Sequence, residues 1–170
     1  LIPTYYLMGV FVDHFLARKS GGAIVFDTKL CWNTLDMINR GGGKAVPAET
    51  GHAFMKQKMH RHGAVYGGEL SSHHYFGDFY GCDSGMFAWL TVLQLLDQKG
   101  ESIQALIQER RDEIYCTPEI TMSLSDVDAA FALALKAYGD KACDVDHFDG
   151  LSFVMPGDWR FSLRRSKTEP

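Results

Sequence analysis

The sequence predicts an α/β protein, because helical patterns alternate with short apolar runs in its first half. Apolar side chains recur at helical spacing in three segments, and each segment is followed by a run that is typical of a buried strand. The expected helices cover residues 3–18, 31–40 and 53–60, and the expected strands cover residues 23–26, 44–47 and 64–66. Helices that alternate with strands indicate a layered fold whose sheet is at least partly parallel.

Two more helices are expected before the pattern changes. Residues 83–96 carry so many apolar side chains that we expect this helix to be buried against the sheet. It is too short to cross a membrane, which takes about 20 apolar residues. Residues 102–113 predict an amphipathic helix with Ile107 and Arg110 on one stripe.

From Tyr115 onward the sequence predicts a small α+β unit. Ser125 is expected to cap a helix that ends at Gly139, and Asp128 completes a capping box with it. Asp149-Gly150 is the signal of a hairpin turn. The strands expected in this unit cover residues 119–124, 143–147, 151–155 and 159–163.

The composition is that of a globular protein, with 46% hydrophobic and 22% charged residues. A formal charge of −4 argues against nucleic acid or an anionic membrane as a partner. No signal-peptide pattern is present, and we expect a cytoplasmic protein. We expect two domains, at residues 1–112 and 113–170, of which the second is short for a complete domain. Because the chain starts at Leu1 and not at Met, we expect it to be a piece of a longer protein.

Neither the cysteines nor the histidines have the spacing of a metal site. No two cysteines form a C-x-x-C pair, so we expect free, buried thiols and no zinc ribbon. Five histidines lie between His52 and His74, but their spacing matches neither H-E-x-x-H nor a zinc finger. We expect no metal site, and a zinc protein is an alternative that metal analysis would distinguish. The cysteines are Cys31, Cys82, Cys116 and Cys143.

The densest polar stretch, residues 66–76, follows a predicted buried strand. It therefore lies at the carboxyl end of a strand, where open α/β sheets bind ligands. Gly67 and Gly68 allow close approach of the backbone, and the Glu69 carboxylate and Ser71 hydroxyl are suited to hold adjacent sugar hydroxyls. A solvent-exposed glycine turn accounts for the same residues equally well.

Other polar groups follow strands or open a helix. Lys29 follows the strand at 23–26, and Thr50-Gly51-His52 opens the helix at 53–60, where backbone amides favour anions. Each of these two signals for a binding site is weak alone. Both segments are expected at the same edge of the sheet, which strengthens the interpretation. Residues 164–168 carry two guanidinium groups, an ammonium group and two hydroxyls, which suit a phosphate as well as they suit a solvated basic tail.

Several stretches together resemble one family in order and composition. They are Thr50-Gly51-His52, Tyr66 to Ser71, His73 to Phe76, Cys82 to Met86, Asp158 to Phe161 and Arg164 to Pro170. The combination resembles the bacterial phosphomannomutases, in the phosphomannomutase/phosphoglucomutase branch of the α-D-phosphohexomutase family. The sequence departs from that pattern at Ser72, where Ala or Gly is usual, at Gly77, where a basic residue is common, and at Lys167, where many members have Asn.

The resemblance implies that the chain covers the third of four domains and about half of the fourth. The third would be a three-layer α/β/α sugar-binding domain, and the fourth an α+β domain similar to the TATA-box-binding protein. The N-terminal domains, which the chain lacks, would supply a phosphoserine and an Asp-x-Asp-x-Asp loop that binds Mg²⁺. Neither loop has a match here, so we expect this chain to hold no cofactor and to be inactive alone.

The implied reaction is an isomerisation by intramolecular phosphoryl transfer. The parent protein would interconvert mannose 6-phosphate and mannose 1-phosphate, with the glucose phosphates as further candidates, through a hexose 1,6-bisphosphate. The alternative is a stand-alone module that binds a sugar phosphate or regulates another protein, without catalysis.

The resemblance also implies a role for each candidate residue. Glu69 and Ser71 would hold the 3- and 4-hydroxyls of the sugar, and His73 would bind substrate beside them. Lys29 and His52 would lie near the reacting groups. The residues that would bind the non-reacting phosphate are Arg164, Ser166, Lys167 and Thr168.

Overall fold

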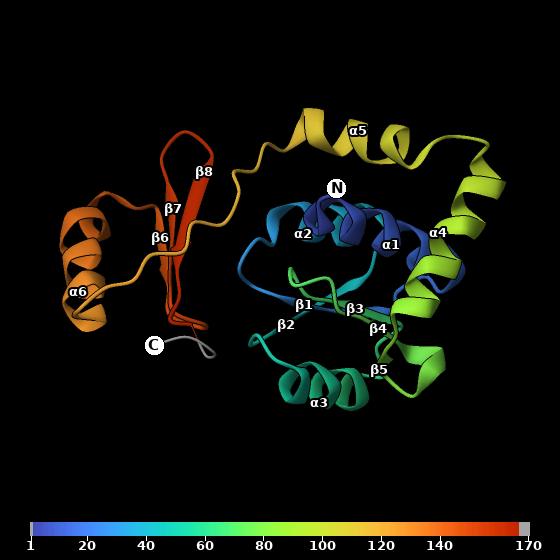
Figure 1. The fold of residues 1–170 in the computed structure, drawn as a ribbon, viewed down its shortest axis with the longest axis horizontal. Coiled ribbons are helices and arrows are strands. Elements are labelled where there is room, and N and C mark those ends of the chain that lie inside the picture. Colours follow the sequence, from blue (N-terminus) through green and yellow to red (C-terminus); the bar gives the residue numbers. More distant parts are fainter. Residues whose placement is uncertain (1, 167–170) are drawn as a thin grey trace. The chain divides into compact units, whose positions relative to one another are not determined.

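The computed structural model describes residues 2–166 and contains two compact units, Leu1–Cys116 and Thr117–Pro170 (Figure 1). The first unit is built on a five-stranded sheet with the order β2-β1-β3-β4-β5. The central strand β1 (Ala23–Asp27) pairs in parallel with β2 (Lys44–Ala48) and with β3 (Tyr66–Gly68). The parallel arrangement predicted from the alternating pattern is therefore confirmed.

Two short strands extend the sheet beyond β3. The strands β4 (His74–Phe76) and β5 (Cys82–Asp83) are antiparallel, and a 3₁₀ turn, η1 (Gly77–Phe79), joins them. Neither strand was expected, because runs of three and two residues are too short to show an alternating pattern.

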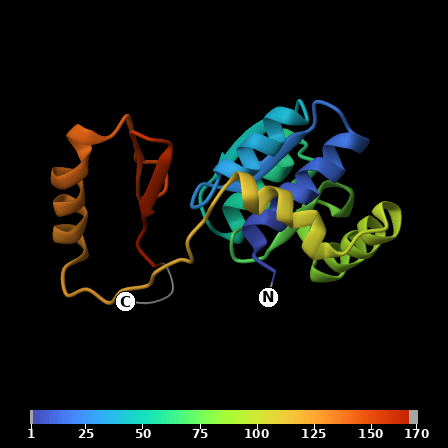
Figure 2. The same ribbon diagram turned by 90° about the horizontal axis from the view of Figure 1, so that it is seen from above.

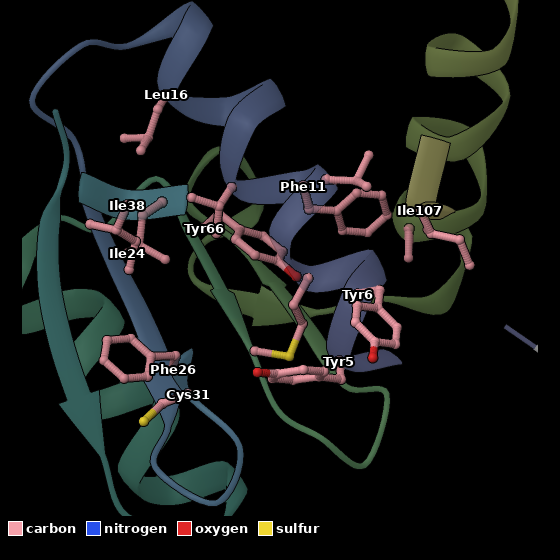
Figure 3. Packing of buried hydrophobic residues seen from close by; sticks show 14 of the residues in the cluster. Tyr5, Tyr6, Phe11, Leu16, Ile24, Phe26, Cys31, Ile38, Tyr66 and Ile107 are labelled. Atoms are coloured by element: carbon pink, nitrogen blue, oxygen red, sulfur yellow. The ribbon is translucent and has the colours of Figure 1, made fainter. Parts of the chain in front are cut away.

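Helices cover both faces of this sheet. Figure 1 shows α1 (Thr4–Arg18) and α2 (Trp32–Arg40) on one face and α3 (His52–His62) on the other. All five residues of β1 are buried, as a central strand between two helical layers requires. Ile24 packs with Phe11 of α1 and Tyr66 of β3 in the larger core (Figure 3). Val25 belongs to the opposite core with Met55 of α3, so the predicted α/β/α sandwich is confirmed.

The two remaining helices of this unit have different surroundings. The helix α5 (Ile103–Glu113) contacts α1 and buries Ile107 and Arg110, which lie on the predicted stripe. The helix α4 (Gly85–Lys99) was expected to be buried, and this expectation is wrong. It follows the edge strand β5, so only the stripe of Ala88, Thr91 and Leu95 is covered. Met86 is 64% exposed and Trp89 57% exposed.

The second unit packs one helix on a three-stranded antiparallel sheet with the order β6-β7-β8. Its elements are α6 (Val127–Tyr138), a 3₁₀ turn η2 (Gly139–Lys141), β6 (Asp144–Asp146), β7 (Leu151–Met155) and β8 (Trp159–Leu163). Figures 1 and 2 show α6 along one face of this sheet. Phe131 of α6 packs against the buried cluster of Leu151, Phe153 and Met155. The predicted hairpin and the strand that follows it are confirmed.

Two expectations for the second unit are wrong. Residues 119–124 are exposed and form no strand, because in the described part of the chain no strand lies beside them to complete a ladder. The helix N-cap is Asp126 and not Ser125, since the carboxylate of Asp126 accepts a hydrogen bond from the backbone N–H of Ala129 at 2.9 Å. The capping box with Asp128 is therefore absent.

The cysteines fit the expectation only in part. All four lie in the described residues, and none forms a disulfide. Cys31 is buried as expected, whereas Cys143 is exposed and the other two are half-buried. Over residues 2–166, the structure contains no helix with the length and apolar character that a membrane span needs.

Candidate functional site

The polar segments that follow β1 and β3 meet the start of α3 at one edge of the first sheet. Parallel strands bring their carboxyl ends to the same edge, and here β1, β2 and β3 do so. The turn after β3 is tight: the backbone N–H of Glu69 donates to the carbonyl of His73, and that of Ser72 donates to the carbonyl of Glu69, each at 3.0 Å.

Glu69 is the buried centre of this edge, with an exposed fraction of 2%. Its Oε1 accepts a hydrogen bond from the backbone N–H of Gly51 at 2.8 Å, and its Oε2 accepts one from the Tyr75 hydroxyl at 2.5 Å. Burial, followed by the hydrogen bond to this carboxylate and by its charge, raises the pKa of Tyr75 far above the ordinary range. Glu69 thus connects β4, its own turn and the N-cap of α3.

Asp27 holds the same turn through a hydrogen bond. It ends β1, it is buried, and its Oδ2 accepts a hydrogen bond from the backbone N–H of Leu70 at 2.8 Å. Lys29, two residues further along, is half-buried at the same edge. The two segments that carry Lys29 and Glu69 are therefore fixed to each other through a charged hydrogen bond, which is stronger than a neutral one.

Ser71 and Ser72 occupy the exposed tip of the turn. Ser72 has a φ of 70°, a left-handed conformation that glycine adopts without strain and serine does not. Its hydroxyl bonds to the Thr4 hydroxyl, which holds the tip against α1. Ser71 Oγ lies 3.0 Å from His73 Nδ1, so these two candidate residues form a hydrogen-bonded pair.

His52 and His73 face each other beside Ser71. Their rings form an edge-to-face pair with centroids 4.7 Å apart, and His52 Nδ1 lies 3.5 Å from Asp83 Oδ1. Lys56 Nζ lies 3.4 Å from the same carboxylate oxygen. Partial burial raises the pKa of Asp83, but a backbone hydrogen bond, His52 and Lys56 together bring it below its ordinary value.

The phosphate-binding candidates belong to the second unit. Arg164 follows β8 directly, and its Nε is buried without a hydrogen-bond acceptor among residues 2–166. The neighbouring Arg165 pairs with Asp128, and its guanidinium carbon lies 5.7 Å from the Phe131 ring centroid. Ser166 is exposed. Lys167 and Thr168 lie outside the described residues.

The structure thus gathers His52, Glu69, Ser71 and His73 at one place, with Lys29 at the same edge. Sequence reasoning assigned no role to the residues that hold them, which are Asp27, Lys56, Tyr75 and Asp83, although the family resemblance includes the stretches around Tyr75 and Asp83. An aspartate that ends a buried apolar strand was the one available signal for Asp27, while the others depend on contacts between separate elements.

Comparison with known proteins identifies the family. Residues 3–114 match the family model described as phosphoglucomutase/phosphomannomutase, alpha/beta/alpha domain III. The chain is 44% identical to a Xanthomonas campestris protein named phosphohexose mutases and 43% identical to an Escherichia coli phosphomannomutase. Each match covers 99% of this chain, and 38% and 37%, respectively, of those proteins.

A solved structure has the same fold over nearly the whole chain. A phosphoglucomutase/phosphomannomutase family protein from Burkholderia thailandensis superposes with a TM-score of 0.79 at 26% identity, covering 99% of this chain and 36% of that one. The present chain therefore spans little more than a third of the relatives it matches. With its α/β/α sandwich and the family model matching residues 3–114, the chain belongs to the phosphoglucomutase/phosphomannomutase family.

Proposed function

We propose that this chain provides sugar and phosphate recognition to a phosphohexomutase that interconverts mannose 6-phosphate and mannose 1-phosphate. Its relatives named phosphomannomutase support mannose phosphates as substrates, with glucose phosphates as further candidates. The observation that carries the proposal is the buried Glu69 carboxylate, which holds Gly51 and Tyr75 at the carboxyl edge of a parallel sheet, beside His52 and the hydrogen-bonded pair of Ser71 and His73.

Sugar recognition is assigned to Glu69 and to the more exposed polar groups around it. A carboxylate has about four lone-pair positions, so Glu69 can accept from sugar hydroxyls in addition to its two protein donors. Ser71 and His73 add a hydroxyl and a ring nitrogen at the rim. In a hexose 1,6-bisphosphate that turns over between two phosphoryl transfers, the 3- and 4-hydroxyls exchange places. One Glu/Ser pair can then serve both orientations.

His52 and Lys29 are assigned to the reacting end of the sugar. Both lie at the edge that Glu69 organises, and both have side-chain nitrogens that can donate a hydrogen bond to a phosphoryl oxygen. Arg164 and Ser166, together with Lys167 and Thr168 in the part not described, are assigned to the phosphate that does not react. A guanidinium binds phosphate through two parallel N–H donors, which fixes orientation as well as charge.

Magnesium and the phosphoryl-carrying serine are assigned to other parts of the parent protein. Among residues 2–166 one group of three ligand-bearing side chains lies close together, and two of its members are histidines. Magnesium prefers oxygen ligands, so this group does not fit it. Without a phosphoryl donor, the 170-residue chain alone is expected to be inactive. We also expect the parent to be cytoplasmic.

The experiment compares the isolated chain with the parent enzyme. The chain alone, given mannose 1-phosphate, glucose 1,6-bisphosphate and Mg²⁺, should form no mannose 6-phosphate. In the parent enzyme, Ser71→Ala should lower kcat/KM by roughly two- to tenfold, the worth of one hydrogen bond. Turnover by the isolated chain would contradict the division of labour proposed here. An unchanged kcat/KM would show that Ser71 does not touch the sugar.

A further inference from the structure

We propose that His52, His73 and Asp83 form a binding site for Zn²⁺ or a similar divalent transition-metal ion. Each side chain offers one ligand atom, and these three atoms lie within 4.8 Å of one another. The residues come from three separate elements: His52 begins α3, His73 precedes β4, and Asp83 ends β5. Two imidazoles and one carboxylate are a donor set found in zinc sites with three protein ligands.

The backbone under these side chains is fixed. The hydrogen bond from Gly51 to Glu69 anchors the residue before His52, and the pairing of Tyr75 with Asp83 joins β4 to β5. The side chains themselves retain freedom, since those of His52 and Asp83 are 50% and 24% exposed. Zinc–ligand bonds of about 2.0–2.2 Å would require the three atoms to close in by roughly 1 Å, which side-chain rotation supplies.

A further contact orients His73 for this role. Its Nδ1 is paired with the Ser71 hydroxyl at 3.0 Å, so Nε2 is the nitrogen left to face the ion. Metal-binding histidines commonly hold their second ring nitrogen in this way, which fixes the ring and its tautomer. The donor set favours zinc, nickel or cobalt over magnesium, because imidazole suits the transition ions and magnesium prefers oxygen.

Lys56 is the group that opposes metal binding. Its ammonium lies 3.4 Å from Asp83 Oδ1 and neutralises that carboxylate when no ion is bound. A cation that binds Asp83 must displace or repel Lys56. Removing the ammonium should therefore tighten metal binding at this site. Non-specific binding of metal ions elsewhere on the surface would not respond to this single substitution.

The site overlaps the proposed sugar site, since His52 and His73 belong to both. A bound zinc ion and a hexose phosphate would therefore exclude each other. This consequence rests on the proposed function, whereas the binding of zinc does not. The test of the metal site can accordingly be made without any sugar.

The experiment is a Zn²⁺ titration of the 170-residue chain, followed by NMR of the histidine ring nitrogens and by calorimetry. We expect the His52 and His73 signals to shift together and to saturate at one equivalent. His52→Ala, His73→Ala and Asp83→Asn should each weaken binding at least about tenfold, and Lys56→Met should strengthen it. Mg²⁺ at the same concentration should leave both histidine signals in place.

The matched control is the double variant His60→Ala/His62→Ala, which removes two exposed histidines from the other end of α3. It should keep the affinity of the unaltered chain. Unchanged thermal unfolding of each variant without metal shows that the fold is intact. The proposal is overturned if zinc binds equally well to the His52, His73 and Asp83 variants, or if His60 and His62 respond first.

Discussion

The Glu69 carboxylate accepts a hydrogen bond from the Gly51 backbone at 2.8 Å, and this contact joins the turn after β3 to the N-cap of α3. Glu69 is buried and Gly51 is half-buried. A hydrogen bond to a charged acceptor contributes about 1.5–3 kcal/mol. Glu69→Gln keeps the size but removes the charge, and it presents an amide group to two donors. We expect the free energy of unfolding to fall by about 1.5–3 kcal/mol in urea denaturation. The matched control is the exposed Glu101→Gln, which should have almost no effect.

The buried His74 makes stability depend on pH. Burial, and to a smaller extent the charge of His73, lowers the pKa of His74 from 6.5 to about 4. On acidification the unfolded chain therefore takes up this proton before the folded chain does. The stabilising contribution is complete above pH 6.5 and is lost as the pH falls toward 4, by up to roughly 3 kcal/mol.

His74→Gln tests this titration in buffer that contains a chelator. Glutamine does not titrate but can still bond the Tyr66 hydroxyl, which lies 2.7 Å from His74 Nδ1. Unfolding free energies measured from pH 4 to 7 should fall less steeply in the variant than in the unaltered chain. Identical slopes for the two proteins would show that His74 is not the group responsible.

Arg110 joins its own helix, α5, to α2. Its Nε donates to Asn33 Oδ1 at 2.8 Å, while its two terminal nitrogens pair with Asp36 and Glu113 at 2.5 Å each. Arg110 is buried, whereas the carboxylates of Asp36 and Glu113 are partly exposed. Removing Arg110 therefore leaves the buried Asn33 Oδ1 without its donor and the two carboxylates without this counter-charge. We expect Arg110→Ala to lower the free energy of unfolding by about 3 kcal/mol. The neighbouring Arg111→Ala, at an exposed position, should change it by less than about 0.5 kcal/mol.

The exposed apolar side of α4 should contribute little to the stability of this chain. Trp89→Gln removes a large side chain that is 57% exposed, and we expect a change below about 0.5 kcal/mol. Leu95→Ala on the covered stripe should cost about 2–5 kcal/mol, because it leaves a cavity. Thermal or urea unfolding of the two variants measures the loss of stability from each substitution. A large loss from Trp89→Gln would mean that this side of the helix is packed in solution.

The sequence predicts the first unit well where local patterns decide the structure. The apolar run before Asp27 and the glycines at 41–43 mark a strand and a turn directly, and every predicted helix exists. The strand predicted at 64–66 lies two residues later, at Tyr66–Gly68, because Gly67 and Gly68 pair with β1 instead of ending the strand. Composition cannot show whether a helix lies over a sheet or follows its edge strand, which is why α4 was expected to be buried. Ser125 and Asp126 are adjacent and both can cap a helix, so the sequence alone does not show which of them is the N-cap.

The candidate site was predicted in its positions but not in its connections. Glu69, Ser71 and His52 could be placed at one edge because parallel strands end together. The contacts of Glu69 with Gly51 and Tyr75 join segments that only the folded chain brings together. The same holds for Asp83, whose neighbours come from α3.

The central claim is that this chain recognises a sugar phosphate within a larger enzyme. The most direct test of it is to substitute two adjacent arginines in turn and to measure kcat/KM. Arg164 is assigned to the phosphate, whereas Arg165 is held by Asp128 within the second unit. In the parent enzyme, we expect Arg164→Ala to lower kcat/KM for mannose 1-phosphate by about 10- to 100-fold, the worth of charged hydrogen bonds to phosphate. Arg165→Ala should stay within about twofold of the unaltered enzyme, well under the loss from a charged hydrogen bond. Equal values of kcat/KM for the Arg164 variant and the unaltered enzyme would contradict the account.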